Sequence, residues 1–585
     1  MAILFQERAI DRQFASFICR ESGGTTSHLF RLLVSLLSSA VGRGNICLDL
    51  ADCAGQTLSL DGKEIVLPDV DALVELLRSM PTLGLPGQHR PLVLDVDGRL
   101  YLYRFWRYEH ELAANILQKA STQAEDIDDA ILQAGLARLF PFCEGEKNDR
   151  QKEAASVALH RQLCVISGGP GTGKTSTVVR ILALLLEQKE GRKQRIAMTT
   201  PTGKAAARLK ASLNDMKPTL ECPDEVKLAM PDNVVTIQRL LGAVSGSSRF
   251  RYSTKNQLPF DTVIVDEASM IALPLMTALV AALKPSARLI LLGDKDQLAS
   301  VEAGAVLGDI CSAGEEGSEA SPLSSSLVKL EKNYRFQAGS GIAEISRAVN
   351  AGLGEETLAL MKSTTLNGIA WQELPEREEL RRVLAKTVLE GYRSYLAAES
   401  AMEALERFDR FRILCALRDG PYGVNGLNSS IESILEREGL IRQESRGYRG
   451  RPLLVTVNDY SMQLFNGDTG ILFPDTERGG ALMAFFPAPD GGVRSIVPER
   501  LPLHETAFAM TVHKSQGSEF NRVVMVLPPV DSDVVTRELI YTGITRAKES
   551  VEIWSNEGVF CRAVRKKTER HSGLREALVI STLRS

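Results

Sequence analysis

Short apolar runs that alternate with longer amphipathic stretches dominate the middle of the chain. Four of these runs read CVISG, RIAMTTP, TVIVDEA and RLILLGD (164–168, 195–201, 262–268 and 288–294), and each ends in a loop with polar residues. Apolar runs of this length, separated by helical stretches, are typical of a parallel sheet with crossover helices. Ligand-binding loops gather at the carboxyl ends of such strands, so we expect a binding site at that edge of the sheet.

The second half repeats this pattern with an interruption. Residues 351–410 are mostly helical, and FRILCAL, RVVMVLP and SVEIW then indicate a second buried sheet. Between these runs, LLVTVNDY, NGDTGILF, ALMAFFP and VRSIVP are short strands joined by glycine-rich turns, which indicates a small β-barrel inserted near residues 430–505. The predicted fold class is therefore α/β, with two parallel-sheet domains at 116–350 and 351–585 and an inserted barrel.

Residues 1–115 have a different character. They mix helical stretches, such as SHLFRLLVSLLSSAV, with short strands, such as RPLVLDV and LYLYRFW, and no catalytic spacing occurs among them. We expect an α+β domain there that serves for docking to a partner.

Composition limits the class of protein and the cellular compartment that we expect. The 585 residues are 44% hydrophobic and 24% charged, as in ordinary globular domains. Nine cysteines without a C-x-x-C pair argue for reduced thiols rather than a disulfide frame or a zinc ribbon. The first residues carry charges and no run approaches the ~20 apolar residues of a membrane span, so we expect a cytoplasmic protein without membrane contact. A net charge of −4 neither supports nor excludes nucleic-acid binding through a local basic groove.

The stretch GGPGTGKT fits the pattern G-x-x-x-x-G-K-[ST] between a strand and a helix, which is the context of a P-loop. Glycine amides and the helix N-terminus approach phosphate oxygens, the lysine neutralises the terminal phosphates, and the threonine can bind Mg²⁺. We therefore expect ATP and Mg²⁺ as cofactors. The predicted nucleotide-binding residues are Gly168, Gly169, Pro170, Gly171, Thr172, Gly173, Lys174 and Thr175.

Two adjacent acids end the strand TVIVDEASM. A carboxylate at the end of a neighbouring strand is where Mg²⁺ needs its second protein contact, which assigns Asp266 to the metal. The next carboxylate, Glu267, is placed to polarise the attacking water. The sequence therefore predicts hydrolysis, not binding alone.

Six stretches occur in the order expected of superfamily-one helicases. Their residues resemble those of the RecD family, whose members are the alpha subunit of the bacterial exonuclease V helicase–nuclease. This resemblance covers residues from about 148 to 550 and implies two RecA-like P-loop domains. The six stretches are TTPTGKAAARL (199–209), VDEASM (265–270), LLGDKDQLASVEAG (291–304), KNYRF (332–336), TVHKSQGSEF (511–520) and YTGITRAK (541–548).

The resemblance implies roles around the nucleotide. Gln151 matches the glutamine that reads the adenine edge, Tyr334 the aromatic that stacks on the base, and Glu519 the acid that contacts the ribose. Gln297 matches the residue that senses the γ-phosphate. The resemblance also implies that two arginines reach the γ-phosphate from the second sheet, so that hydrolysis depends on closure of the cleft. These two are Arg335 and Arg546.

Single-stranded DNA is the implied track. One phosphate-contacting loop matches Pro201, Thr202 and Lys204, and its counterpart in the second sheet matches Thr511, His513 and Lys514. Short hydroxyl and ammonium donors suit a backbone that is followed without regard to sequence. The stretch RFRYSTKNQLPFD is predicted to form a β-hairpin, near residues 243–261, that resembles a strand-separating pin.

The function implied is an ATP-dependent 5′ to 3′ DNA helicase subunit that acts on double-strand ends in recombinational repair. It would work with RecB-like and RecC-like partners, one of which would supply the nuclease activity. Two alternatives stay open: a freestanding RecD-like helicase, RNA-directed relatives included, and a structural subunit whose ATPase is vestigial.

Overall fold

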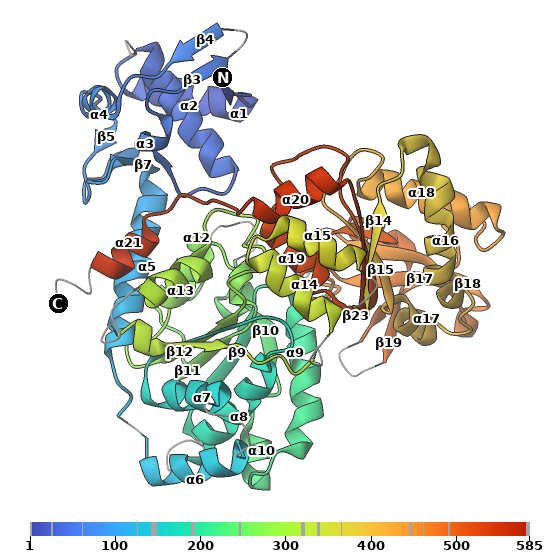
Figure 1. Ribbon diagram of the computed structural model, residues 1–585. Coiled ribbons are helices and arrows are strands. Elements are labelled where there is room, and N and C mark those ends of the chain that lie inside the picture. The colour runs from blue at the N-terminus through green and yellow to red at the C-terminus, as the bar shows by residue number, and fades with distance from the viewer. Residues whose placement is uncertain are drawn as a thin grey trace.

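The computed structural model describes residues 3–24, 27–60, 63–125, 127–141, 149–188, 193–244, 247, 249–316, 322–335, 340–363, 366–443, 447–459, 461–488 and 492–580. An N-terminal domain lies above one of two larger bodies, and the other body lies beside it (Figure 1). We call the body built on the six-stranded sheet the first lobe and the body built on the five-stranded parallel sheet the second lobe.

The N-terminal domain has the predicted α+β character. The predicted helix at its centre is confirmed as α2, whose first turn is capped by Ser27, the side chain of which accepts a hydrogen bond from the Phe30 amide (3.1 Å). The helices are α1 (Ala9–Glu21), α2 (His28–Gly42), α3 (Leu50–Cys53) and α4 (Val70–Arg78). The strands form the sheets β1-β3-β4 and β2-β7-β6-β5, with bounds β1 (Ile3–Leu4), β2 (Cys47–Asp49), β3 (Thr57–Leu60), β4 (Lys63–Val66), β5 (Leu83–Gly84), β6 (Leu92–Leu94) and β7 (Arg99–Leu102).

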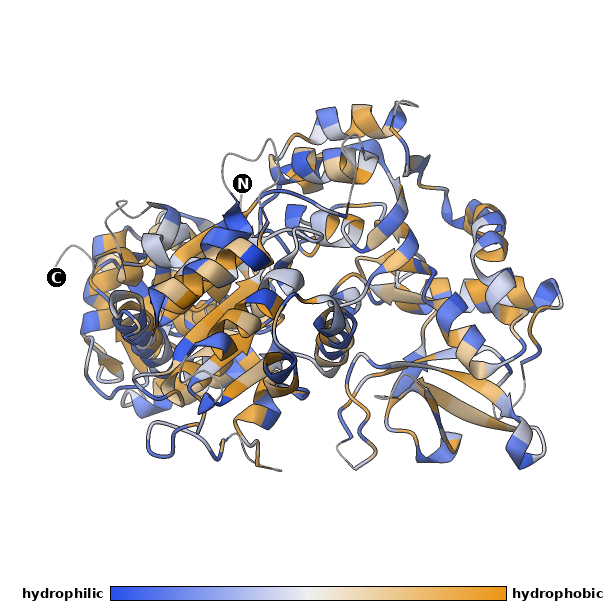
Figure 2. Cartoon of the chain, turned by 90° about the horizontal axis from the view of Figure 1, so that it is seen from below, coloured by the Kyte–Doolittle hydropathy of each residue, from blue (hydrophilic) through white to orange (hydrophobic). Residues whose placement is uncertain are grey.

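The sheet of the first lobe is parallel throughout, in the order β10-β9-β11-β12-β8-β13. Successive residues of a strand face opposite sides: Val165 packs with α5, α12 and α13, whereas Ile166 packs with α7, α8 and α9. Figure 2 shows these apolar strands enclosed between helices. The strands are β8 (Leu163–Gly168), β9 (Ile196–Thr200), β10 (Val234–Thr236), β11 (Thr262–Val265), β12 (Arg288–Gly293) and β13 (Leu327–Leu330).

The four strands predicted for this lobe are confirmed, and the sheet gains β10 and β13 at its edges. These edge strands have three and four residues, which is too short to give a periodic signal. The helices of the lobe are α5 (Tyr103–Ser121), α6 (Asp129–Leu139), α7 (Arg150–His160), α8 (Lys174–Glu187), α9 (Gly203–Met216), α10 (Asp224–Ala229), α11 (Ile237–Leu240), α12 (Leu273–Ala281) and α13 (Val306–Glu316).

The second lobe carries a parallel sheet in the order β14-β23-β22-β15-β21. Its first strand lies in the stretch predicted to be mostly helical, where a half-exposed edge strand gives no continuous apolar run. The strands are β14 (Ile369–Glu373), β15 (Phe411–Cys415), β21 (Ala509–Thr511), β22 (Phe520–Val526) and β23 (Ala547–Ser555). The helices are α14 (Gly341–Asn350), α15 (Gly354–Lys362), α16 (Arg377–Leu396), α17 (Ala401–Phe408), α18 (Val424–Arg437), α19 (Arg537–Ile544) and α20 (Glu557–Arg565).

An antiparallel unit is inserted between α18 and β21, as predicted. Its order is β19-β18-β17-β16-β20, and among the described residues its edge strands β19 and β20 do not pair with each other. Closure of this sheet into a barrel therefore stays a prediction. The strands are β16 (Arg451–Val455), β17 (Thr469–Asp475), β18 (Ala481–Pro487), β19 (Val493–Ile496) and β20 (His504–Thr506).

Several features differ from expectation. The helix α5 (Tyr103–Ser121) runs across the predicted boundary at residue 115 and packs with α12 of the first lobe, and α14 (Gly341–Asn350), predicted for the first domain, packs with α19 of the second lobe. In the described part of the predicted pin, isolated bridges join Ala243 to Phe250 and Ser253 to Asn256 in place of hairpin strands. Beside the first bridge, the Arg251 amide donates to the Gly242 carbonyl (3.0 Å) and the Tyr252 amide to the Leu241 carbonyl (3.0 Å), so a short antiparallel pairing is present. Leu258, further along, is fully buried, and its amide donates to the Ala282 carbonyl (2.8 Å). The last helix, α21 (Leu574–Ile580), was predicted to belong with the second motor domain but packs beside α5 and α13 of the first lobe (Figure 1).

Candidate functional site

The loop between β8 and α8 has the backbone that a P-loop requires. Gly171 and Gly173 adopt positive φ angles of 81° and 83°, which L side chains rarely adopt. A Cβ on Gly171 would lie 2.5 Å from the Cβ of Arg335, and one on Gly173 would lie 2.2 Å from Nε2 of Gln151. Glycine is therefore needed here both for the turn and for the close approach of neighbouring side chains.

Lys174 lies over this loop. Its Nζ donates to the carbonyls of Gly168 (2.5 Å) and Gly169 (3.0 Å), while the Thr172 hydroxyl donates to the Gly169 carbonyl (2.8 Å). An ammonium group has three donors, so these two bonds fix its position and leave capacity for a phosphate oxygen.

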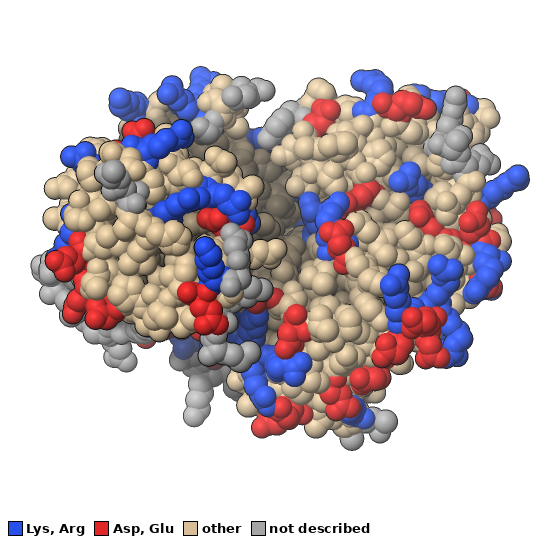
Figure 3. All heavy atoms as spheres, turned by 90° about the horizontal axis from the view of Figure 1, so that it is seen from above, with Lys and Arg blue, Asp and Glu red and all other residues tan. Residues whose placement is uncertain are grey.

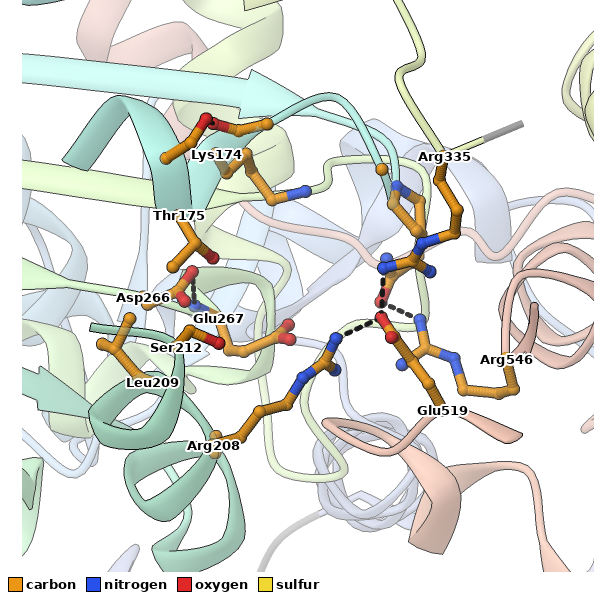
Figure 4. A pocket seen from close by; sticks show the side chains of 16 residues that line it. Lys174, Thr175, Arg208, Leu209, Ser212, Asp266, Glu267, Arg335, Glu519 and Arg546 are labelled. Carbon is orange, nitrogen blue, oxygen red and sulfur yellow. Dashed lines mark hydrogen bonds and ion pairs between the residues drawn. The ribbon is translucent and has the colours of Figure 1, made fainter. Parts of the chain in front are cut away.

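The two predicted acids follow β11. Asp266 Oδ1 accepts a hydrogen bond from the Glu267 amide (2.8 Å), and Glu267 has a φ of 55°. A left-handed residue other than glycine costs about 1 kcal/mol, so the fold accepts strain to aim this carboxylate into the cavity (Figure 4). Burial, and then the neighbouring Glu267, raise the pKa of Asp266 to about 6. A divalent cation between Asp266 and the hydroxyl of Thr175, which lines the same cavity, fits this set of hard oxygen donors.

These residues line one cavity of about 220 Å³ between the lobes. Figure 4 shows its charged side chains pointing toward a shared space. The first lobe and the segment after it contribute Pro170, Gly171, Gly173, Lys174, Thr175, Ser176, Ala205, Arg208, Leu209, Ser212, Asp266, Glu267, Gln297 and Arg335, and the second lobe contributes Glu519 and Arg546.

Arg546 crosses from the second lobe, as predicted. It is 2% exposed, and its Nη2 donates to Oε1 of Gln297 (3.1 Å) in the first lobe. Its other donors bind the carbonyls of Thr542 (3.1 Å) and Ser518 (3.2 Å). Gln297 in turn donates to Asp294 Oδ2 (2.9 Å). The guanidinium group is therefore held by both lobes where they meet. We call this contact between the lobes the seam.

Arg335 corrects one expectation. It follows β13, which pairs with β8 in the first sheet, so this arginine does not arrive from the second sheet. Its Nη2 donates to Glu519 (2.6 Å), whereas its Nη1 is buried with no hydrogen-bond partner among the described residues. A buried, unpartnered guanidinium nitrogen at a phosphate-sized cavity fits a γ-phosphate.

Glu519 joins three parts of the cavity wall. It pairs with Arg335 and also with Arg208 of α9, a residue that the sequence reasoning did not single out. Burial alone would raise the pKa of Glu519, but the two guanidinium groups outweigh it and hold the pKa at about 2. The predicted ribose contact stays a prediction, since this carboxylate faces the phosphate side of the cavity.

Low pH should weaken the ion pairs of Glu519 with Arg335 and Arg208. The folded pKa of about 2 lies below the usual 4.5, so stability from Glu519, roughly 3 kcal/mol at neutral pH, is lost as pH falls from 4.5 toward 2. We expect the denaturant midpoint of Glu519→Gln to fall less between pH 5.5 and 3.5 than that of the wild type. The exposed Glu436→Gln serves as a control that keeps the wild-type pH dependence. Equal pH dependence in all three proteins would contradict the assignment.

The two residues that are predicted to hold the base, Gln151 and Tyr334, lie next to the phosphate loop and the segment after β13. Gln151 Nε2 donates to the Thr172 carbonyl (3.1 Å) and its Oε1 accepts from Arg180 (3.0 Å), which uses half of the amide's capacity. Gln151 and Tyr334 line a second cavity of about 100 Å³. The Tyr334 ring is 54% exposed, with Lys332 Nζ 4.9 Å from its centroid.

The first predicted DNA-contacting loop lies at the end of β9. Thr202 caps α9 by accepting from the Ala205 amide (3.2 Å), and Pro201 precedes it. Burial, against the nearby Asp409 and Asp468, lowers the pKa of Lys204.

The second predicted loop follows β21. Its Lys514 donates to Asn466 Oδ1 (2.6 Å), and the Lys514 amide donates to Thr511 Oγ1 (3.3 Å). Phe465, next to Asn466, packs on Gly203, where a Cβ would lie 2.7 Å from the ring. One turn of the inserted sheet therefore contacts both predicted loops.

Further seam contacts escaped the sequence reasoning. The Tyr541 hydroxyl donates to Asp294 Oδ2 (3.0 Å), the Leu298 amide to Thr542 Oγ1 (2.9 Å), and Gln516 Nε2 to the Leu298 carbonyl (2.8 Å). All lie inside the six stretches quoted above, so their position near the seam was implied although their partners were not.

Three family models and one solved structure are similar to parts of this chain. Residues 6–101 match the family described as RecBCD enzyme subunit RecD, N-terminal domain, residues 151–303 match an AAA domain, and residues 506–553 match a UvrD-like helicase C-terminal domain. The solved structure of Bacteroides Pif1 bound to ssDNA is similar over 73% of this chain and 95% of its own, with 14% identity and a TM-score of 0.39.

Curated relatives extend along nearly the whole chain. The RecBCD enzyme subunit RecD of Mycobacterium tuberculosis H37Rv is 37% identical over 97% of this chain and 94% of its own length. The Haemophilus influenzae subunit is 36% identical over 82% and 80%. The ATP-dependent RecD2 DNA helicase of Deinococcus radiodurans is 29% identical over 82% of this chain and 59% of its own. Since the match to RecD subunits runs through the N-terminal domain and both lobes, this chain belongs to the RecD family.

Proposed function

We propose that this chain is the ATP-driven 5′ to 3′ DNA motor of a RecBCD-type helicase that acts on double-strand ends in recombinational repair. The observation that carries the proposal is the seam itself. Arg546 of the second lobe binds Gln297 of the first at a cavity that also holds Lys174 and the unpartnered Nη1 of Arg335.

Each side chain has a task in hydrolysis. Gln151 and Tyr334 hold the base, and Lys174 and Arg335 neutralise the terminal phosphates. Thr175 and Asp266 would hold Mg²⁺, which supplies neutralising charge to the phosphates when it is bound. Glu267 orients the attacking water and accepts its proton. Arg546 stabilises charge in the transition state only while the lobes are closed, so turnover reports the position of the lobes.

DNA movement follows from the same closure. We propose that Lys204 and its neighbours grip the strand from the first lobe, while His513 and Lys514 grip it from the second. Backbone contacts of this kind are independent of sequence. Figure 3 shows a hollow in the upper face, with side chains of both charges around it. Alternating grip during opening and closing of the cleft then moves the strand, and the direction rests on the family resemblance.

The chain is proposed to act within a complex with RecB-like and RecC-like subunits, which would supply the nuclease. Similarity supports this choice, because the chain is 37% identical to a RecD subunit but 29% identical to the RecD2 helicase, and residues 6–101 match the N-terminal domain of RecD. The N-terminal domain, proposed at residues 1–115, offers exposed apolar side chains for docking. They are Ile10, Phe17, Val66, Leu85 and Val96. None of the helices in the described ranges is long and apolar enough to cross a bilayer.

Unwinding of tailed duplexes tests the proposal. The tagged chain, purified from its host with whatever partners remain bound, should unwind a 5′-tailed duplex in the presence of ATP once any motor of opposite polarity has been removed. A matched 3′-tailed duplex is the control for polarity. Unwinding of the 3′-tailed substrate alone, or ATP hydrolysis that single-stranded DNA does not stimulate, would contradict the proposal.

A further inference from the structure

Residues 566–573, which we call the C-terminal strap, join α20 to α21 and contact the N-terminal domain and both lobes. At its start, Thr568 donates through its hydroxyl (2.6 Å) and its amide (2.9 Å) to Glu538 of α19 in the second lobe. At its end, the Ser572 hydroxyl and the Gly573 amide each donate to Glu109 of α5 (2.9 Å).

The middle of the strap also binds the N-terminal domain. The His571 amide donates to Asn45 Oδ1 (2.9 Å), and the Ile46 amide donates to the His571 carbonyl (2.8 Å). Between these anchors, the only described side chain of the strap that hydrogen-bonds the loop after β12 is that of Arg570.

Arg570 binds three carbonyl groups of that loop. Nη2 donates to Ser300 (2.5 Å), and Nη1 donates to Glu302 (2.9 Å) and Gly304 (2.8 Å). Three carbonyl dipoles that converge on one point repel one another unless a cation lies between them. The shape of the loop therefore depends on this guanidinium group, whose planar fork reaches all three oxygens.

The same loop begins at the nucleotide site. Gln297 accepts from Arg546, and three residues later, at Ser300, the chain enters the part held by Arg570. Between them, Leu298 is bound on both sides by the second lobe, through Thr542 and Gln516. A displacement of the loop at residues 300–304 would therefore move Gln297 relative to Arg546.

Two further neighbours surround Arg570. Burial, and then the Arg570 charge, lower the pKa of His513 in the proposed second DNA grip, and Gln516 of the same loop donates to the Leu298 carbonyl (2.8 Å). On the other side, the Gly304 amide donates to the Gly44 carbonyl (3.0 Å), and a Cβ on Gly44 would lie 3.1 Å from Arg570 Cζ. Arg570 thus stands where the N-terminal domain, the nucleotide-site loop and the DNA loop meet.

We propose that Arg570 is a positioning residue that holds the loop Leu298–Gly304 against the second lobe, so that the state of the DNA loop, whose Gln516 binds Leu298, is transmitted to Gln297 and Arg546. This inference rests on the proposed motor function. It adds to that function Arg570, a residue that lies after the last of the six stretches quoted above. Arg570 does not touch the nucleotide cavity, and it acts through the loop.

Arg570→Gln in the full chain, with its bound partners, tests this inference. The ratio of kcat for ATP hydrolysis with and without a single-stranded oligonucleotide should fall by at least about fivefold, within the usual range of coupling between two sites. The KM for ATP should change by less than about twofold, because the groups that bind it are untouched. Amide hydrogen exchange at residues 298–304 should become faster.

Two variants sharpen the result. Arg562→Gln removes an exposed arginine of α20 that pairs with Asp531 (2.7 Å), and it should match the wild type. Arg570→Lys keeps the charge but not the fork, so stimulation and exchange should be intermediate. Wild-type stimulation and loop exchange in a folded Arg570→Gln variant, or in a folded Lys variant if the Gln variant does not fold, would overturn the inference.

The two proposals fail in different ways. A wild-type chain without DNA stimulation would contradict the proposed function. Loop exchange does not depend on hydrolysis, so it would still decide whether Arg570 holds the loop.

Discussion

Lys174→Gln should lower the turnover number for ATP hydrolysis by about a hundredfold or more, the usual cost of removing one preorganised donor from a charged transition state. In the structure, its ammonium group is held by the carbonyls of Gly168 and Gly169 at the mouth of the phosphate loop. Glutamine is shorter and neutral, so it neither reaches the terminal phosphates nor offsets their charge. Phosphate release at saturating ATP and oligonucleotide measures the effect.

The control for this variant is Lys386→Gln, which removes an 84% exposed lysine of α16 that pairs weakly with Glu390. Both variants should unfold at the wild-type temperature and keep the same bound partners. Turnover within twofold of the wild type in Lys174→Gln would contradict the site. A wild-type chain that binds its partners but hydrolyses no ATP would instead favour the alternative of a structural subunit with a vestigial ATPase.

The central strands of both sheets could be predicted because each is a short apolar run bounded by polar loops. The strand β8 is buried at every position, and such runs stand out in any sequence. By contrast, β14 has partly exposed and exposed residues without a regular period at a sheet edge, so nothing in its composition separates it from the helices around it. The stretch RFRYSTKNQLPFD was predicted as a hairpin, and in its described part the antiparallel pairing is limited to a few residues around the bridge between Ala243 and Phe250.

The site shows the same division. The phosphate loop and the acids after β11 could be predicted because each is formed by residues that are adjacent in the sequence and therefore also adjacent in the structure. The pairing of Glu519 with Arg208 and Arg335 joins residues separated by 311 and 184 positions, and no sequence pattern records it. The same limit explains why Arg335 was placed on the second sheet. The motif identifies Arg335 as a site residue. Which lobe carries Arg335 depends on the sheet that the preceding strand β13 joins, and β13 is too short to predict.

Arg546→Gln should have the larger effect, a loss of roughly a thousandfold in turnover, as for other arginines that reach a transferring phosphoryl group across a cleft. Nucleotide affinity should change only a few-fold, because Lys174, Gln151 and the loop remain. The buried guanidinium group also satisfies the Thr542 and Ser518 carbonyls, so its loss leaves acceptors unpaired and should destabilise the second lobe by about 1–3 kcal/mol. Turnover must therefore be compared with stability.

Arg412→Gln is the matched control for Arg546→Gln, because Arg412 is a fully buried arginine of the same lobe that binds the carbonyls of Ala507 (3.0 Å) and Phe408 (3.3 Å) and does not line the cavity. It should destabilise the lobe by a similar amount yet keep turnover within a few-fold at temperatures where it stays folded. Arg546→Lys keeps the charge but not the planar fork, and should recover only a small part of the rate. If both glutamine variants lose turnover equally, Arg546 stabilises the lobe without acting on the phosphate, and closure of the seam would not control hydrolysis.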